Sequence, residues 1–543
     1  VDLTTDEVWV LDSEAESWPE SAAAADALWR KRITNDILVS ELQAERGVAR
    51  TRDEIVESIS KRYARMLKDK MSADSADMLE SFLGAFTHNF DPHSAYFKPA
   101  TDDNFNIDIS NSLEGIGARL RVDGDYTVVE DIVAGGPADL DGELQPGDRI
   151  VAVGQGGGMP EDVIGMRLDR VVAQIRGDKG TEVRLTVIPV DEPDTTRVVT
   201  ITRDKVLLSE SDAEGELIEK DGHKYGLIEV PSFYIDPNRP LPDGGYYGAS
   251  ADVRRLLGEL EAEGMEGLIL DFRGNGGGSL SEAIAMAGLF IDSGPIVQIR
   301  DRSGDTEVLS DPDRELVYDG PMVVLTDPLS ASASEIVAGA LQDYGRAVVV
   351  GAETTHGKGT VQRVVDLDYF LSQAWGIQAR SGGLKLTIQK FYRVSGGSTQ
   401  NRGVLSDVVL PSYWDGLDIY ESDLENALAY DEIEAARFRS VGDVGSAAEN
   451  LRASSATRIA QSEDFQTLAV DLAERAEGKD RTELSLNIDT RRAELEAATE
   501  GEEAEPEGEE EEEEEDAGPD RAADFILQEA AAVLGDWIGL QGG

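Results

Sequence analysis

The chain of 543 residues contains no cysteine, which excludes disulfides, thiol catalysis and cysteine-ligated zinc or iron–sulfur sites. It has only four histidines, none in a His-x-x-x-His pair, so an imidazole-rich metal site is not expected, although carboxylates alone can hold Ca²⁺ or Mg²⁺. Basic residues are scarce: 50 against 108 acidic ones give a net charge of −58, which makes nucleic acids and anionic membrane surfaces poor partners. No apolar run approaches the roughly 18 residues that span a bilayer, so we expect no membrane span.

The negative charge has two parts. Residues 500–520 carry 14 acidic side chains and no basic one, a composition that predicts a solvated, disordered insert. Without this insert the charge is still −44, so the excess is spread over the folded chain. The chain has 13 Lys and 37 Arg. This excess of Arg over Lys, together with the negative charge, fits either adaptation to high salt, where self-repulsion is screened, or simply an acidic envelope protein.

The length predicts three or four domains, and the sequence pattern changes along the chain. The first 105 residues or so show helical spacing, for example in 52–70 and 78–86, until Asp91-Pro92 interrupts it. From about Leu113, short β-like runs separated by Gly and Asp turns predict a β-rich module of about ninety residues, with a helix over 163–175. Strand-like and helix-like stretches then alternate, which predicts an α/β core, and beyond Pro411 helices return.

The β-rich module begins with two glycines, Gly115 and Gly117, on either side of an apolar residue and just before a predicted strand. Such a loop can turn backbone N–H groups toward the terminal carboxylate of a peptide, while the strand edge accepts the peptide by β-addition. The segments 135–138 and 144–150 follow in the order found in PDZ domains, which the module resembles.

A Gly-rich loop, Asp271–Gly278, lies between a predicted strand and a predicted helix. Backbone N–H groups at such a junction suit an oxyanion or a phosphate. The loop is not a Walker motif, because no Gly-Lys-Ser/Thr follows, and taken alone such a loop is more often a tight strand-to-helix turn.

Two further segments contain a serine and a lysine. Ser332 lies at a strand-to-helix junction, and Lys358 lies in a Gly-Lys-Gly sequence after the next predicted strand. A serine hydroxyl needs a neighbouring base, and a buried lysine with a lowered pKa can serve as that base. The alternatives are structural: Ser332 with Glu335 forms a helix capping box, and Gly-Lys-Gly is a common surface turn.

These segments occur in order with Asp91–Phe97, Ser112–Gly117, 388–393 and 396–400, and over nearly the whole chain they resemble the tail-specific branch of the carboxyl-terminal processing peptidases. The resemblance implies a multidomain α/β fold, in which a crotonase-like α/β protease core carries an inserted β-rich PDZ domain and flanking helical domains. The expected domains are 1–105 (helical and shorter than in that branch, as in a truncated chain), 112–205 (PDZ), 206–411 (Ser-Lys protease core) and 412–543 (helical, with the acidic insert 500–520).

The resemblance also implies catalytic roles. It makes Ser332 the nucleophile, Lys358 the general base and Gln362 the residue that orients the lysine, with Ser334 as the rival nucleophile. The stretch from serine to lysine is longer by a single residue than is usual in the family. That extra residue lies in the segment that includes His356, for which we expect a loop-shaping role.

The oxyanion hole is expected to use the N–H of Ala333, together with a second donor from Gly277 or Gly278. In the PDZ domain we expect Gly115 and Gly117 to bind the substrate's terminal carboxylate, with Leu113 or Ile116 in the side-chain pocket.

The function implied is a serine endopeptidase that recognises apolar C-termini of proteins or peptides through its PDZ domain and cleaves through an acyl-enzyme, with no metal or cofactor. One alternative is an inactive PDZ scaffold on the same fold, and another is an acyl-CoA enzyme, which would leave the PDZ module unexplained. By the same resemblance we expect a periplasmic location, although the chain begins at Val1 without a signal peptide, and helical domains that dock an adaptor protein.

Overall fold

The computed structural model describes residues 2–11, 18–47, 50–208, 211–241, 244–376, 380–442, 444–479, 481–499 and 524–541. The chain divides into two compact units: Val1–Ala73 with Ala469–Asp520, and Asp74–Leu468 with Arg521–Gly543. The acidic insert 500–520 lies outside the described residues.

The first unit combines both ends of the chain. It contains β1 (Val8–Val10), α1 (Ala22–Arg46), α2 (Arg52–Met71), β23 (Glu483–Ser485) and α13 (Ile488–Thr499). Strands β1 and β23 pair antiparallel, and the core is formed by Leu38 of α1 and Ile55 of α2, with Ile488 and Leu495 of α13 packed against it. The helical spacing of 52–70 therefore predicted α2 correctly.

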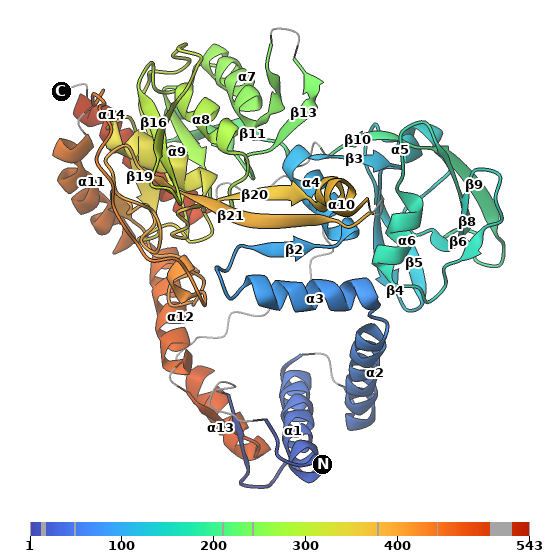
Figure 1. Cartoon of the computed structure of the whole chain (residues 1–543). Helices are drawn as coiled ribbons and strands as arrows, with labels where there is room; N and C mark the ends of the chain where they lie inside the picture. The colour runs from blue at the N-terminus through green and yellow to red at the C-terminus, as the bar shows by residue number, and fades with distance from the viewer. Residues whose placement is uncertain are drawn as a thin grey trace. The chain divides into compact units, whose positions relative to one another are not determined.

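The PDZ module lies in the second unit (Figure 1). Its sheet has the order β4-β5-β6-β8-β9, with β7 paired to β6. The bounds are β3 (Ser112–Gly115), β4 (Ala118–Asp123), β5 (Tyr126–Ile132), α5 (Pro137–Asp141), β6 (Arg149–Gln155), β7 (Glu161–Asp162), α6 (Leu168–Ile175), β8 (Glu182–Ile188), β9 (Arg197–Thr202) and β10 (Asp204–Leu207). Helix α6 begins at Leu168, later than predicted, because Gly165 takes the left-handed φ of +71° in the turn before it.

The α/β core is a six-stranded sheet of order β11-β12-β15-β18-β19-β22, parallel from β12 to β22 and antiparallel at β11. Its elements are β11 (Glu214–Lys220), β12 (His223–Glu229), β13 (Ile235–Pro240), β14 (Tyr246–Gly248), α7 (Ala249–Ala262), β15 (Gly267–Asp271), α8 (Leu280–Gly288), β18 (Met322–Thr326), α9 (Ala333–Asp343), β19 (Val348–Gly351) and β22 (Val408–Val409).

Successive residues of β15 face opposite layers. Leu268 and Leu270 pack in the core with helices α7, α8 and α9, whereas a side chain at Gly267 would touch Leu534 and Ile538 of α14 (Phe525–Gln541). Because both faces are covered, the strands are continuous apolar runs, as the sequence shows. The loops that follow β15 and β18 meet at the carboxyl edge of the parallel strands, where ligand sites of such sheets lie.

A second sheet, of order β17-β16-β21-β2 with β20 also paired to β21, was not predicted. Its elements are β2 (Ala95–Phe97), β16 (Pro295–Asp301), β17 (Thr306–Ser310), β20 (Thr360–Asp366) and β21 (Gly383–Tyr392); α10 (Leu367–Trp375) follows β20, and α3 (Ser75–Thr87) and α4 (Pro99–Ser110) precede and follow β2. Strand β2 lies before the PDZ module, whereas its partner β21 lies near the end of the protease core. No local pattern encodes a pairing between segments so far apart in the chain.

The helices after the core begin later than predicted. Residues 412–442 are irregular apart from the 3-10 turn η2 (Glu421–Asp423), and α11 (Val444–Ile459) and α12 (Glu463–Lys479) follow. Asp415 accepts the N–H of Ser412, and Asp423 accepts the N–H of Tyr420, both at 3.0 Å. Short acidic side chains that bind nearby N–H groups compete with helix formation in this way.

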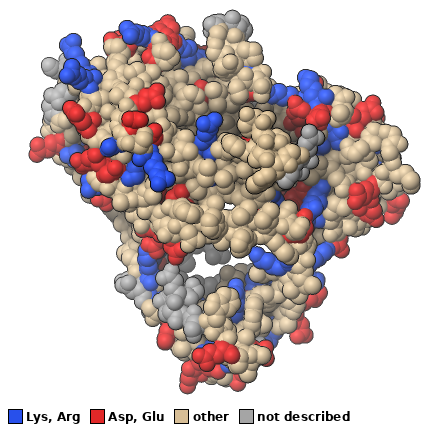
Figure 2. Space-filling view, viewed as in Figure 1, with Lys and Arg blue, Asp and Glu red and all other residues tan. Residues whose placement is uncertain are grey.

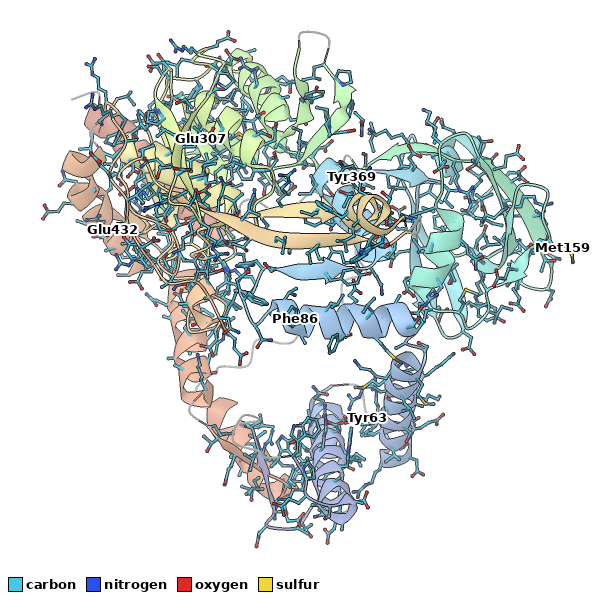
Figure 3. All side chains as sticks on the ribbon, in the orientation of Figure 1. Tyr63, Phe86, Met159, Glu307, Tyr369 and Glu432 are labelled. Carbon is cyan, nitrogen blue, oxygen red and sulfur yellow. The ribbon has the colours of Figure 1, made fainter. Side chains whose placement is uncertain are left out.

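On the face of the molecule drawn in Figure 2, Asp and Glu side chains are scattered among Lys and Arg instead of gathered in one patch. Among apolar residues, Phe86 of α3 and Tyr369 of α10 project from the ribbon (Figure 3) and are 57% and 62% exposed. None of the described helices has the length and apolar character needed to cross a membrane.

Candidate active site

Ser332 lies between β18 and α9, and its backbone has φ +56° and ψ −107°. A positive φ is strained for a residue with a side chain and costs about 1–3 kcal/mol, and such strain concentrates at functional sites. The residue directly precedes the first turn of α9, where N–H groups lack intrahelical acceptors. The sequence predicted the strand-to-helix junction but not this strained conformation.

The hydroxyls of the neighbouring serines, Ser330 and Ser334, donate to backbone carbonyls of the Gly-rich segment. Ser334 is fully buried and its hydroxyl donates to the carbonyl of Asn275 at 2.9 Å, while Ser330, also buried, donates to the carbonyl of Phe272 at 2.8 Å. Both hydroxyls thus fix the Gly-rich loop, whereas Ser332 is only partly buried. This geometry favours Ser332 over Ser334 as the nucleophile.

The Gly-rich loop lies against Ser332. A Cβ at Gly277 would lie 2.8 Å from Cβ of Ser332, and the N–H of Gly277 donates to Oδ1 of Asn275 at 2.8 Å. By contrast, the N–H groups of Gly278 and Ala333 have no acceptor in the part of the chain that the structure describes. Gly278 has φ +143°, and a Cβ there would lie 2.5 Å from the carbonyl oxygen of Phe233. Of the two glycines, the structure therefore favours Gly278 as an oxyanion donor.

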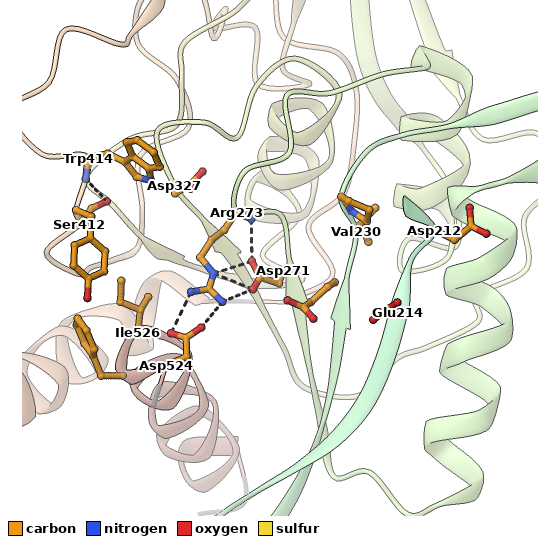
Figure 4. A pocket seen from close by; sticks show the side chains of 14 residues that line it. Asp212, Glu214, Val230, Asp271, Arg273, Asp327, Ser412, Trp414, Asp524 and Ile526 are labelled. Atoms are coloured by element: carbon orange, nitrogen blue, oxygen red, sulfur yellow. Dashed lines mark hydrogen bonds and ion pairs between the residues drawn. The ribbon is translucent and has the colours of Figure 1, made fainter. Parts of the chain in front are cut away.

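An ion-pair network anchors the start of this loop (Figure 4). Arg273 donates to Asp271 at 2.7 Å and to Asp524, just before α14, at 2.8 Å. A pocket of about 580 Å³ lies beside this network and has the acidic residues Asp212, Glu214 and Glu229 in its wall, but neither Ser332 nor Lys358 lines it. The network fixes the base of the Gly-rich loop, and the pocket is separate from the serine and lysine.

Glu335 connects the serine segment with the lysine segment. Its buried carboxylate accepts the N–H of Ser332 at 2.7 Å and the N–H of Lys358 at 3.0 Å, both at Oε2. The other oxygen accepts the N–H of Gly357 at 2.8 Å and the hydroxyl of Thr355 at 2.6 Å. Burial raises the pKa of Glu335 to about 7, although these hydrogen bonds act in the opposite direction. The sequence predicted only a capping residue here.

Lys358 precedes β20 and is partly buried. Burial, followed by the positive charge of Lys385, lowers the pKa of Lys358 to about 8, against the opposing effects of Glu421, Glu335 and Asp91. Near pH 8 about half of the molecules carry this amine in its neutral form, which can accept a proton. Within the described residues, no hydrogen bond joins Lys358 Nζ to Ser332 Oγ.

Gln362 lies on β20, and its amide faces two threonines. Its Nε2 donates to Oγ1 of Thr360 at 2.8 Å and to Oγ1 of Thr387 at 3.2 Å. Thr387 in turn donates to Asp91 at 2.8 Å, which connects Gln362 to the segment before the PDZ module. No hydrogen bond between Gln362 and Lys358 occurs in the parts that the structure describes, so the orienting role stays a prediction.

The loop before Lys358 is held through His356. Its N–H donates to the carbonyl of Ser330 at 3.0 Å, and its carbonyl accepts the N–H of Glu421 at 2.9 Å. Its Nε2 lies 3.5 Å from the carboxylate of Glu421, which also contacts His93. These contacts agree with a loop-shaping role for His356. Sequence reasoning missed Glu421, because nothing in the residues around it distinguishes it from the many other acidic side chains.

In the PDZ module, the loop 113–117 is held by backbone contacts. The N–H of Ala138 donates to the carbonyl of Ile116 at 2.7 Å, and the N–H of Val133 donates to the carbonyl of Gly117 at 3.0 Å. Gly117 has φ +74° and packs against Gly136, which requires glycine. Ile116 is buried in the module's core, and Leu113 is partly exposed. Carboxylate binding by Gly115 and Gly117 stays a prediction.

Four family models match successive parts of the chain. The tail specific protease N-terminal domain matches residues 1–100, the PDZ domain 106–188, peptidase family S41 224–410, and the C-terminal domain of tail specific protease 414–539. The tail-specific protease of Haemophilus influenzae is 37% identical over 548 aligned residues, which cover 99% of this chain and 76% of that protein. The chain belongs to the tail-specific proteases of peptidase family S41.

Other relatives align with smaller parts of the chain. The carboxyl-terminal-processing protease of Picosynechococcus is 32% identical and aligns with 63% of this chain and 75% of its own length. A crystal structure of the PDZ domain of a carboxy-terminal protease from Vibrio cholerae in complex with a peptide is 53% identical over 18% of this chain and 97% of that chain, with a TM-score of 0.17. The multidomain α/β fold with a PDZ domain and the serine protease activity are thus confirmed, and the inactive scaffold is not favoured.

Proposed function

We propose that Ser332 and Lys358 form the catalytic dyad of this protease. The observation that carries the proposal is the single oxygen, Oε2 of Glu335, that accepts the N–H groups of both residues. A buried carboxylate shared in this way fixes two segments of backbone relative to each other, as a nucleophile and its base require.

In the proposed reaction, the neutral amine of Lys358 removes the proton of the Ser332 hydroxyl while Oγ attacks the carbonyl carbon of the scissile peptide bond. The ammonium then returns that proton to the leaving nitrogen, and the C–N bond breaks to give an ester on Ser332. Lys358, neutral again, takes a proton from water while the water oxygen attacks the ester carbon. The ammonium then gives this proton to Oγ of Ser332 as the ester C–O bond breaks, which releases the acid and restores the serine and the neutral amine. The lowered pKa of Lys358, about 8, supports this role.

The developing oxyanion would be bound by the N–H groups of Ala333 and Gly278. Both groups lack acceptors within the described residues, and Ala333 begins helix α9, whose dipole favours negative charge at this end. Loss of one such donor costs about 3–4 kcal/mol of transition-state stabilisation.

Substrate selection is assigned to the PDZ module. In this proposal Gly115 and Gly117 bind the terminal carboxylate of a protein or peptide, and Leu113 contacts an apolar side chain at that end. The partner is thus a polypeptide with an apolar C-terminus. The proposal also includes a periplasmic location and adaptor docking on the helical domains, which rest on the resemblance to the tail-specific branch. Fractionation of the source cells tests the location.

The experiment that tests the function is cleavage of a fluorogenic peptide with an apolar C-terminus. We expect turnover by the wild type, and a loss of at least about 10⁴-fold in kcat for Ser332→Ala and for Lys358→Ala with unchanged circular dichroism. A Lys358→Ala variant that retains activity would show that another group is the base.

A further inference from the structure

Glu421 is a fully buried carboxylate surrounded by donors from three distant segments. Nε2 of His93, from the segment before the PDZ module, lies 2.8 Å from Oε2, and Nε2 of Gln400 donates to Oε1 at 2.8 Å. Nε2 of His356 lies 3.5 Å from Oε2. His356 belongs to the loop between β19 and β20, residues 352–359, which contains Lys358 and is called the lysine loop below. A carboxylate only accepts hydrogen bonds, so the Nε2 atom of His93 carries a hydrogen.

The same cluster holds the backbone on both sides of Lys358. On one side, the N–H of Glu421 donates to the carbonyl of His356 at 2.9 Å. On the other side, the side chain of Gln400, fixed by its bond to Glu421, accepts the N–H of Gly359 at 2.9 Å. Glu421 therefore acts on the lysine loop through both of its flanks.

Glu421 also contributes charge. Burial raises the pKa of Glu421, but hydrogen bonds from His356 and His93 outweigh this effect and hold it at about 2. The carboxylate is thus ionised at any pH at which the protein is assayed. Its negative charge raises the pKa of Lys358, in opposition to burial and to Lys385.

We propose that Glu421 is a positioning residue for Lys358: with Gln400, His356 and His93 it fixes the backbone of the lysine loop, and its negative charge acts on the amine. This inference rests on the proposed role of Lys358 as the base. It assigns a role to a segment after the protease core and to the sequence Asp91-Pro92-His93-Ser94 before the PDZ module.

The test compares three variants in the peptide cleavage assay over a range of pH. Glu421→Gln removes the charge and should lower kcat/KM at least about tenfold at pH 9, because a misplaced group costs heavily in rate. The acid limb of its pH profile, where activity falls because Lys358 becomes protonated, should also move to lower pH, since Lys358 loses a neighbouring anion. Glu421→Asp keeps the charge on a shorter side chain, so it should lower kcat and leave the acid limb in place.

The matched control is Glu282→Gln, which neutralises another buried carboxylate, bonded to the N–H and hydroxyl of Ser250 on α7. It should leave the acid limb unchanged. If the Glu421→Gln limb coincides with that of the wild type, or if Glu421→Asp retains full kcat, the proposal is overturned. Should Glu421→Gln fail to fold, the Glu421→Asp result still decides the positioning part.

A second readout does not depend on catalysis. In a Ser332→Ala background, the rate of acetylation of Lys358 by acetic anhydride, followed by peptide mass spectrometry across pH, reports the pKa of the amine. The other charged groups that act on this amine, Lys385 from β21, Glu335 from α9 and Asp91, are the same in both proteins. The midpoint should be lower with Glu421→Gln, and an unchanged midpoint would overturn the proposal. Failure of Lys358 as the base would appear instead as activity in Lys358→Ala, so the two failures are distinguishable.

Discussion

Oε2 of Glu335 accepts the backbone N–H of Lys358 at 3.0 Å, and the same oxygen accepts the N–H of Ser332 at 2.7 Å. The relationship explains how two separate segments are held at a fixed spacing. Glu335→Gln replaces one acceptor oxygen with a donor, so at most one of its two pairs of hydrogen bonds survives. We expect kcat to fall at least about tenfold with little change in KM, measured by steady-state peptide cleavage. An unchanged kcat would mean that Glu335 serves only as the helix cap.

The serines around the turn should respond differently to substitution. Ser334→Ala removes a buried hydroxyl that donates to Asn275, so it should cost about 1–2 kcal/mol in the free energy of unfolding and leave part of the activity. Ser332→Ala should remove activity at nearly unchanged stability. Denaturant titration of each variant beside its cleavage rate separates the two effects, and the reverse pattern would make Ser334 the nucleophile.

The activity should depend on pH through Lys358. With a pKa of about 8, the amine is neutral above that pH and protonated below it, so kcat/KM should fall about tenfold for each pH unit lower than about 7. Lys385→Gln removes a neighbouring positive charge, which raises the pKa of Lys358 and should move the acid limb to higher pH. A profile of kcat/KM against pH for both proteins is the measurement. A shift to lower pH would contradict the assigned electrostatics.

Gly278 and Gly276 provide a matched pair for the oxyanion hole. A Cβ at Gly278 would lie 2.5 Å from the carbonyl oxygen of Phe233, whereas a Cβ at Gly276 would meet nothing within 4 Å. Gly278→Ala should therefore displace its N–H and lower kcat by about 10²–10³-fold, while Gly276→Ala should retain most of the activity. Equal losses in the two variants would indicate that the loop as a whole, and not this N–H, is needed.

Recognition of the substrate's C-terminus is tested on the substrate itself. Amidation of the terminal carboxylate removes its charge, so KM should rise at least about tenfold if Gly115 and Gly117 bind it. The matched control is a peptide of the same sequence extended by one charged residue, which should also bind weakly. Equal cleavage of the free and amidated peptides would show that the protein does not recognise the terminal carboxylate.

The sequence predicted those parts of the fold that depend on local patterns. An apolar run predicted strand β18 at its observed bounds. The pattern also correctly predicted that Gly278 and Ser332 lie in loops between a strand and a helix. The second sheet could not be predicted, because β2 and β21 meet only through tertiary pairing. For the same reason Glu421 was missed: its carboxylate is bonded to His93, which lies 328 residues away in the sequence.

The positive φ of Ser332 was also beyond prediction. Local preferences disfavour this conformation for serine, and it is held by the surrounding structure, including the bond from its own N–H to Glu335. The capping-box pattern predicted the contact between the two residues correctly. It did not predict that the same carboxylate also accepts N–H groups of the lysine loop.

The most direct test of the dyad is to identify the residue that carries the acyl group. The protein is mixed with a slowly hydrolysed depsipeptide, in which an ester replaces the scissile amide and the apolar C-terminus is free, then quenched in acid and mapped by tandem mass spectrometry. We predict an acyl group on Ser332 in the wild type and none in Lys358→Ala. An acyl group on Ser334, or equal labelling of Ser332 without Lys358, would contradict the account.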